Sequence, residues 1–283
     1  MNILILPNFK KKQCLSVSQQ AVHMLQKGGA KVFAFPEAAE RLDRSVHPIQ
    51  KEQLDLGIDF AVVIGGDGSI IRAAKLLLSF EIPLIGINLG TLGFLADIQT
   101  DRLEDLLPLL NGKYEVQECT TLEVHIQNDV KDISFTAIND VVICKNALSG
   151  IIDFKISCSG VETARFPADG VVVSTAVGST AYAMSAGGAL IHPDVKAFSI
   201  TPICAHSLFA RPMIVPEAEV VRVQTNANEQ QRRVFVIADG NESAQITSQD
   251  VVSVFRHPKR ARFVKPCAQR YYTAINEKLM DRS

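Results

Sequence analysis

The stretch AVVIGGDGSIIRAAKLLL, residues 61–78, joins an apolar segment to an apolar helical pattern through a glycine-rich turn. The apolar residues before the turn predict a strand buried on both faces, and those after it predict a largely buried helix. Such a turn usually offers backbone N–H groups and the positive end of a helix to a phosphate. Asp67 lies inside this turn, where a negative charge opposes that role. The carboxylate therefore needs its own explanation.

Two explanations for Asp67 remain open from the residues alone. In the structural one, GGDG is a tight turn in which Asp67 caps the following helix. In the functional one, the carboxylate binds the divalent metal of a nucleotide or accepts a proton from an attacking hydroxyl. The turn follows a predicted parallel strand, and ligands bind at the carboxyl ends of such strands. That position favours phosphoryl transfer.

The pattern around this turn predicts an α/β domain over residues 1–112 with a parallel, Rossmann-like sheet. We expect a helix that is capped by Ser16 or Ser18 and ends at Gly28–Gly29, and another helix over residues 101–110, which contain Pro108. The predicted strands are NILIL (2–6), KVFAF (31–35), FAVVI (60–64) and IPLIGIN (82–88).

After residue 112 the period of the apolar residues changes to two, which predicts half-buried antiparallel strands. We expect an all-β, sandwich-like domain over residues 113–265 and a helical tail over 266–283, carried by YYTAINEKLM. The clearest alternating segments are TLEVHI (121–126), IIDFKISC (151–158), VVRVQ (220–224) and RRVFVIA (232–238).

Composition excludes several classes of function. The 283 residues carry a net charge of −1 without long runs of one sign, which argues against nucleic acid or an anionic membrane as partner. The six cysteines are scattered without C-x-x-C spacing, and the chain begins with MNILILP, so we expect a reduced, cytoplasmic protein. No apolar run approaches the roughly 20 residues that span a bilayer.

Two further segments carry small and hydroxyl residues. INLGTLGFL (87–95) follows the predicted fourth strand, and its Asn88 could bind a sugar hydroxyl or stabilise the turn. PADGVVVSTAVGSTAYAMSAGGALIHP (167–193) runs from an apolar strand into neutral hydrogen-bonding groups around a narrow space, which is equally compatible with a close-packed helix start. Neither the dinucleotide fingerprint G-x-G-x-x-G nor the P-loop motif occurs in the chain.

Five ordered blocks between residues 60 and 242 resemble the NAD kinase family, which is similar to diacylglycerol kinases and phosphofructokinases in the GGDG turn. They are GGDGS, NLGTLGFL, INDVVI, DGVVVSTAVGSTAYAMSAGG and PICAHSLFARPMIVP. The resemblance implies transfer of the terminal phosphate of ATP to the 2′-hydroxyl of the adenosine ribose of NAD, which gives NADP. It also implies magnesium arriving as Mg-ATP rather than in a fixed metal site, and a homodimer or homotetramer.

The resemblance assigns roles to residues by position. Asp67 matches the catalytic aspartate that orients the acceptor hydroxyl and accepts its proton. The implied substrate-binding residues are Gly68, Arg72, Phe94, Asn139, Asp140, Asp169, Thr180, Ala181, Tyr182, Ser185 and Asn241. The chain departs from the family pattern at Asp140, which replaces glutamate, at Ala176–Val177, which replace Pro-Thr, at Asn241, which replaces glutamine, and at Pro167, where some members carry arginine. Arg165 lies two residues before it.

Two rival functions share these features. A lipid or sphingoid-type kinase carries the same turn, but it would suit a basic or apolar patch facing a membrane and gives no reason for GSTAY. A non-catalytic NAD or NADP sensor would keep the pocket, but binding alone gains nothing from a carboxylate beside phosphates. Asp67 therefore favours the kinase.

Overall fold

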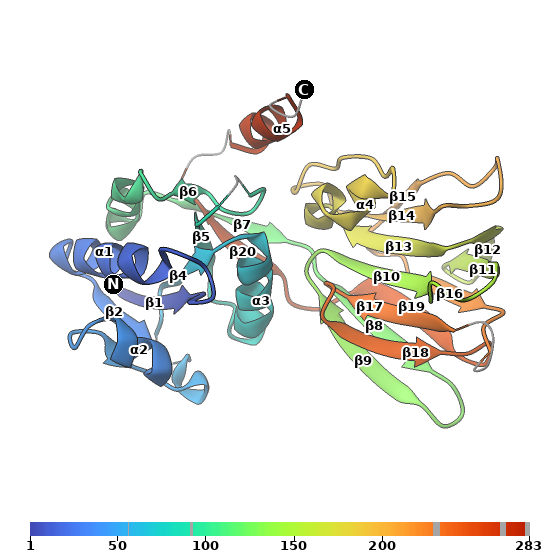
Figure 1. The fold of residues 1–283 in the computed structure, drawn as a ribbon, viewed down its shortest axis with the longest axis horizontal. Helices are drawn as coiled ribbons and strands as arrows, with labels where there is room; N and C mark the ends of the chain where they lie inside the picture. The colour runs from blue at the N-terminus through green and yellow to red at the C-terminus, as the bar shows by residue number, and fades with distance from the viewer. Residues whose placement is uncertain (56, 91–92, 229–232, 267–269, 281–283) are drawn as a thin grey trace. The chain divides into compact units, whose positions relative to one another are not determined.

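The computed structural model describes the whole chain except residues 56, 91–92, 229–232, 267–269 and 281–283 (Figure 1). The chain divides into two compact units: an α/β unit of residues 1–118 and 261–283, and a β unit of residues 119–260. The sequence placed the boundaries at residues 112 and 265. In the structure the first boundary follows residue 118 and the second follows residue 260. The reason is that residues 115–119 and 261–265 form strands of the α/β sheet.

The α/β unit contains an eight-stranded sheet in the order β3-β2-β1-β4-β5-β20-β7, with β6 beside β5. Strands β1 to β5 pair in parallel, as expected for strands joined by helical crossovers. The strands are β1 (Asn2–Pro7), β2 (Lys31–Ala34), β3 (His47–Pro48), β4 (Phe60–Gly65), β5 (Leu84–Asn88), β6 (Ile98–Gln99), β7 (Glu115–Cys119) and β20 (Ala261–Lys265).

Helices cover both faces of this sheet, which explains the continuous apolar runs of its central strands. Helix α1 (Cys14–Lys27) packs on β1, β2 and β4, and α2 (Pro36–Leu42) packs beside it. Helix α3 (Asp67–Leu77) contacts β4, β5 and β20 from the other face, where Gly86 leaves room for the side chain of Ile70. The core on the α1 face includes Ile3, Ile5, Val17, Ala21, Leu25, Phe60, Val62, Ile64, Ile85 and Ile87.

Two details of the predicted helices are wrong. Helix α1 begins at Cys14 after Gln13, which has a left-handed backbone, and no side chain caps it. Ser16 donates its hydroxyl to the Gln13 carbonyl from inside the first turn instead. Residues 101–110 form two short 3-10 helices, η3 (Leu103–Leu106) and η4 (Pro108–Asn111), rather than one α-helix, since Pro108 lacks the N–H that a continuous helix needs. Short 3-10 turns also occur at η1 (Lys51–Gln53) and η2 (Leu78–Phe80).

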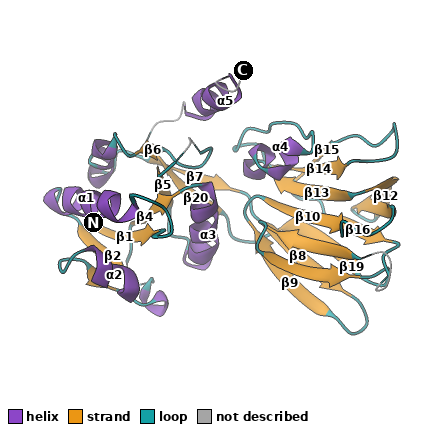
Figure 2. Ribbon diagram, in the orientation of Figure 1, coloured by secondary structure: helices purple, strands orange, loops and turns teal. Residues whose placement is uncertain are grey.

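The β unit consists of two six-stranded antiparallel sheets, in agreement with the all-β, sandwich-like prediction. Figure 2 shows this unit almost entirely as strands, with the small helix α4 (Tyr182–Ser185) preceded by the 3-10 turn η5 (Val177–Thr180). One sheet has the order β15-β14-β13-β10-β17-β18 and the other β12-β11-β16-β19-β8-β9.

The bounds of these strands follow the alternating segments of the sequence closely. They are β8 (Leu122–Gln127), β9 (Asp132–Ala137), β10 (Asp140–Lys145), β11 (Ile152–Cys158), β12 (Val161–Ala168), β13 (Gly170–Thr175), β14 (Ala197–Ile203), β15 (Met213–Pro216), β16 (Val221–Thr225), β17 (Val234–Ala238), β18 (Glu242–Ile246) and β19 (Val251–Arg256).

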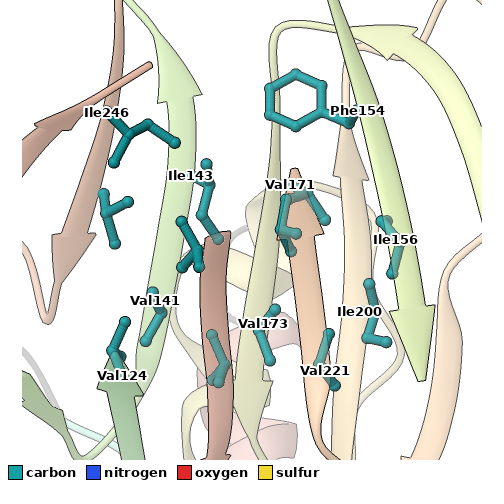
Figure 3. Close-up of a cluster of buried hydrophobic side chains, with 14 of the residues drawn as sticks. Val124, Val141, Ile143, Phe154, Ile156, Val171, Val173, Ile200, Val221 and Ile246 are labelled. Carbon is teal, nitrogen blue, oxygen red and sulfur yellow. The ribbon is translucent and has the colours of Figure 1, made fainter. Parts of the chain in front are cut away.

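The core of the β unit lies between its two sheets (Figure 3). Val141 and Ile143 of β10 and Val171 of β13 come from one sheet, and Phe154 and Ile156 of β11 come from the other. Alternate residues of β10 and β13 point away from this core, toward the segment that contains η5 and α4. The described tail forms α5 (Arg270–Met280), which confirms the helix predicted from YYTAINEKLM.

Candidate functional site

The GGDGS turn lies at the carboxyl end of β4. Strand β4 ends at Gly65, Gly66 is the extended N-cap residue, and Asp67 is the first residue of α3. Gly66 is the N-cap residue and has no side chain, so Asp67 does not occupy the capping position that the structural alternative gave it. The carboxylate instead accepts hydrogen bonds from the backbone N–H of Phe94, at 2.9 Å, and of Leu95, at 3.3 Å.

The loop after β5 therefore positions Asp67. Gly93 lies against the carboxylate so closely that a Cβ at this residue would stand 1.9 Å from Oδ1 of Asp67. Leu89 donates its N–H to the Gly65 carbonyl at 2.9 Å, which joins this loop to the GGDGS turn. Asn88 donates its side-chain amide to the Gly90 carbonyl at 3.0 Å. This bond matches the turn-stabilising role considered for Asn88 beside the sugar-binding one. Phe94 is half-buried, and it contacts Asp67 through its backbone N–H.

The exposed side of α3 carries the other two residues predicted in this unit. Gly68 is exposed, and a Cβ there would meet only the Arg72 guanidinium, at 3.8 Å. Arg72 is exposed one turn later and donates to the Ser69 hydroxyl at 3.3 Å. The side-chain amide of Asn8, just after β1, donates to the same hydroxyl at 2.8 Å. The loops that follow β1 and β4 are thus connected through Ser69.

A second cluster lies in the β unit around two carboxylates at adjacent strand ends. Asp140 begins β10 and is 5% exposed, and Asp239 follows β17 with a left-handed backbone, φ 48°. The Asp239 carboxylate accepts backbone N–H groups of Ile138 and Asn139, each at 2.8 Å, and of Asp140 at 3.3 Å. Burial, together with the negative charge of Asp239, raises the pKa of Asp140 to about 7.

The GSTAY segment packs onto this strand end. The Tyr182 backbone hydrogen-bonds the Asp140 carboxylate, and the Tyr182 side chain is 47% exposed. Thr180 donates its hydroxyl to the Val177 carbonyl at 3.1 Å, and Ala181 donates its N–H to the Gly178 carbonyl at 2.9 Å. Ser185, the last residue of α4, is exposed. Thr180, Ala181, Tyr182 and Asp140 are therefore brought together.

Asn139 is held in the same cluster by its backbone. Its carbonyl accepts the N–H of Thr175 at 2.9 Å, and Gly178 approaches so closely that a Cβ would stand 2.1 Å from the Asn139 oxygen. The buried Oδ1 atom of Asn139 has no hydrogen-bond partner among the described residues. A buried amide oxygen without a partner is costly in a folded protein, which is consistent with an acceptor meant for a ligand.

Two predicted residues lie at the edge of this cluster or away from it. Asn241 donates its side-chain amide to the Asp239 carbonyl at 2.9 Å, and this hydrogen bond supports the turn. Asp169 precedes β13 and pairs with Lys145 at 2.9 Å, near the opposite end of β10 from Asp140. Arg165 is 61% exposed at its side chain and pairs with Glu162 at 2.9 Å.

The sequence analysis missed Asp239 and Asn8. Asp239 belongs to an Asp-Gly pair between β17 and β18, a dipeptide that marks a turn, and only its neighbour Asn241 was singled out. Asn8 directly follows the first predicted strand, at the same sheet edge as the GGDGS turn. Its position after a parallel strand was the available signal.

Within the described ranges, no group of three or more His, Cys, Asp or Glu side chains could hold a metal ion. No described helix has the length and apolarity to cross a bilayer.

Known families match both units. The model of the ATP-NAD kinase N-terminal domain matches residues 3–114, and that of the ATP-NAD kinase C-terminal domain matches residues 138–266. The NAD kinase of Geobacter sulfurreducens is 34% identical over 279 residues, which are 98% of this chain and 97% of that protein. The NAD kinase of Caldanaerobacter subterraneus subsp. tengcongensis is 31% identical over 280 residues, 98% of each chain.

Solved structures share the fold. A crystal structure of yeast NADH kinase complexed with NADH matches with a TM-score of 0.86 and 24% identity, and the match covers 100% of this chain and 88% of the yeast chain. A crystal structure of an NAD kinase from Archaeoglobus fulgidus in complex with ATP matches with a TM-score of 0.74 and 24% identity over 96% of each chain. Both likenesses extend over the α/β unit and the β unit together.

Proposed function

This chain belongs to the NAD kinase family, and from that premise we propose that Asp67 orients the acceptor hydroxyl of NAD and accepts its proton during phosphate transfer. The reaction is the phosphorylation of NAD by ATP to NADP. Family membership favours this reaction over the lipid-kinase and sensor alternatives, because relatives named NAD kinase align along nearly the whole chain.

The observation that carries the role of Asp67 is the way its carboxylate is held. Two backbone N–H groups of the loop after β5 bind it, and the missing side chain of Gly93 leaves the space that the carboxylate occupies. A carboxylate with an ordinary pKa near 3.9 is a weak base for a free hydroxyl. Its contribution in a loose transition state is therefore alignment of the hydroxyl and late acceptance of the proton.

We propose that the start of α3 binds the transferred phosphate. The N-terminus of this 11-residue helix carries no capping side chain, and Gly68 lets a ligand approach its first turn. Arg72 is exposed one turn away and can reach a phosphate oxygen from its position beside Ser69. Both groups would stabilise negative charge on the phosphoryl oxygens.

We propose that the cluster in the β unit binds NAD. Asn139 offers a buried amide oxygen as an acceptor, and Asp140 accepts hydrogen bonds when ionised or donates one when protonated. Tyr182 offers an exposed ring for stacking beside the backbone of Thr180 and Ala181. We also propose substrate contacts at four residues whose positions match the family's motifs: Phe94, Asp169, Ser185 and Asn241. In the structure Asn241 hydrogen-bonds Asp239, and Asp169 forms an ion pair with Lys145.

We propose that magnesium acts as the cation of Mg-ATP. The family resemblance implies that the phosphates would supply most of its ligands, and Asp67 is the carboxylate of the GGDGS turn. When bound, the ion supplies charge neutralisation of the triphosphate.

We also propose a cytoplasmic homodimer or homotetramer. The five cysteines that the structure describes are free thiols, which is consistent with a reducing compartment. The oligomer is implied by the family resemblance, and light scattering coupled to size-exclusion chromatography measures it directly.

The test of Asp67 is an assay for NADP. Purified protein is incubated with Mg-ATP and NAD, and an NADP-specific dehydrogenase reports the product. Asp67→Asn keeps the size of the side chain, so we expect NAD affinity to stay within a few-fold while kcat falls by about 10²–10⁴, as for a lost general base. Asp59→Asn is the matched control, because Asp59 lies at the other end of β4 and also accepts a backbone N–H, that of Asn2 at 2.7 Å. Unchanged turnover in Asp67→Asn contradicts the role.

A further inference from the structure

The strand order of the α/β sheet singles out one position at its edge. From β1 the chain proceeds to β2 and β3 on one side, and β4 and β5 lie on the other, so the order reverses between β1 and β4. In doubly wound sheets, ligands bind outside the carboxyl ends of the strands at this reversal. The loops that flank it are the GGDGS turn after β4 and residues 8–13 after β1.

The loop after β1 carries three consecutive lysines. NFKKKQ, residues 8–13, leaves the strand and enters α1, and Lys10, Lys11 and Lys12 are all exposed. In the part of the chain that the structure describes, no acidic side chain forms an ion pair with any of the three ammonium groups. A run of lysines is ordinarily a solvated surface, so its position must decide whether it has a function.

Contacts fix this loop beside the GGDGS turn. Pro7 at the end of β1 pairs with Ile64 of β4, and Asn8 donates its N–H to the Ile64 carbonyl at 2.9 Å. The Asn8 amide also holds the Ser69 hydroxyl in the first turn of α3, at 2.8 Å. Within the loop, Asn8 accepts the N–H of Lys10 at 3.3 Å and that of Lys11 at 2.9 Å. Asn8 thus connects the backbone of the lysine run to the helix that begins with Asp67.

Phosphoryl transfer from a triphosphate needs cations for the leaving phosphates as well as for the transferred one. The GGDGS turn contains no lysine, and Arg72 is the cation closest to it along the chain. Three other basic groups of this unit are engaged in ion pairs: Arg102 with Asp105, Arg262 with Glu118 and Lys265 with Asp97. Arg41 lies over the Phe9 ring, 3.7 Å from its centroid, which adds a cation beside the same loop.

We propose that the loop Asn8–Lys12 binds the phosphate chain of the phosphoryl donor, with the lysine ammonium groups on its leaving phosphates and Asn8 positioning them. This inference rests on the proposed function, because it places the donor beside Asp67. The recognised chemistry is a linear chain of phosphates, which ATP and inorganic polyphosphate share.

The test replaces the three lysines together and measures each substrate separately. In Lys10→Gln/Lys11→Gln/Lys12→Gln we expect the KM for ATP to rise about 10-fold or more, as for the loss of charge-assisted hydrogen bonds, while the KM for NAD changes less than about 2-fold. The control variant Lys27→Gln/Lys31→Gln/Lys113→Gln removes the same charge from exposed lysines of the same unit and should leave both values unchanged. Equal KM values for ATP in the two triple variants overturn the proposal.

A binding measurement separates this proposal from the proposed function. Calorimetry with a non-hydrolysable ATP analogue, on protein that carries Asp67→Asn, reports donor affinity without turnover. We expect the lysine variant to weaken the Kd by the same factor, and its affinity to depend less on KCl. Inorganic tripolyphosphate should compete with the analogue on the parent protein and compete less on the lysine variant. If tripolyphosphate competes equally on the parent protein and on the lysine variant, or on neither, the loop does not bind the phosphate chain.

Discussion

Gly93→Ala should abolish most of the activity by moving Asp67, although no reacting group is replaced. A Cβ at residue 93 would stand 1.9 Å from Oδ1 and 2.8 Å from Cγ of Asp67, and ordinary contact begins near 3.4 Å. The carboxylate must therefore retreat by about 1.5 Å. Such a movement disrupts the hydrogen bonds from Phe94 and Leu95. Because a misplacement of about 1 Å can cost roughly 10²-fold in rate, we expect kcat to fall about 100-fold.

The assay is NADP formation under saturating ATP and NAD, with thermal unfolding measured in parallel. Gly90→Ala is the control in the same loop, because a Cβ there meets nothing within 4 Å. Its kcat should remain close to that of the parent protein. The carboxylate is at the end of a side chain that can rotate, so the Tm of Gly93→Ala should fall by only a few degrees, as for about 1 kcal/mol. Parent-like turnover in Gly93→Ala refutes the claim that the placement of this carboxylate limits the reaction.

The β unit yields two further predictions. The pKa of Asp140 is raised to about 7, from a usual value near 3.8, so the folded state binds an extra proton between these values and loses stability as the pH rises through this window. Urea titrations at several pH values measure the free energy of unfolding of Asp140→Asn and of the parent protein. The difference in favour of Asp140→Asn should grow from about pH 4 to about pH 7 and then level off. A difference that does not change with pH contradicts the raised pKa of Asp140. Gly178→Ala should destabilise the protein by about 1–3 kcal/mol and raise the KM for NAD. The reason is that the added Cβ would stand 2.1 Å from the Asn139 carbonyl oxygen. Stability and KM equal to those of the parent would show that the loop moves without displacing Asn139.

Local sequence determined the elements of both units. The apolar runs and the alternating runs have different periods, and each period is a property of a few consecutive residues. Strands β1, β4 and β5 and the antiparallel sheets of the β unit follow from them. The failures were also local: Gln13 rather than a serine is the N-cap residue of α1, and Pro108 divides the predicted helix into two 3-10 turns.

The sequence also identified Asp67 as an anomaly, because the negative charge of a carboxylate opposes the binding of a phosphate in a turn of this type. It could not say what holds that carboxylate. The partners are backbone N–H groups 27 and 28 residues away, and backbone groups have no signature in a sequence. Gly93 must lack a side chain because the Asp67 carboxylate lies against it. This requirement is visible only in the structure, where the GGDGS turn and the loop after β5 are side by side.

Tertiary structure alone decided the remaining parts. Strands β7 and β20 join the α/β sheet although the chain between them builds the β unit, so no boundary drawn along the sequence could assign them. Asp239 binds the backbone of residues 138–140 from about 100 positions away, and this pairing, with burial, sets the pKa of Asp140. The order of apolar and polar residues in a segment determines its period, whereas strand register determines which distant groups meet and how far they are removed from water.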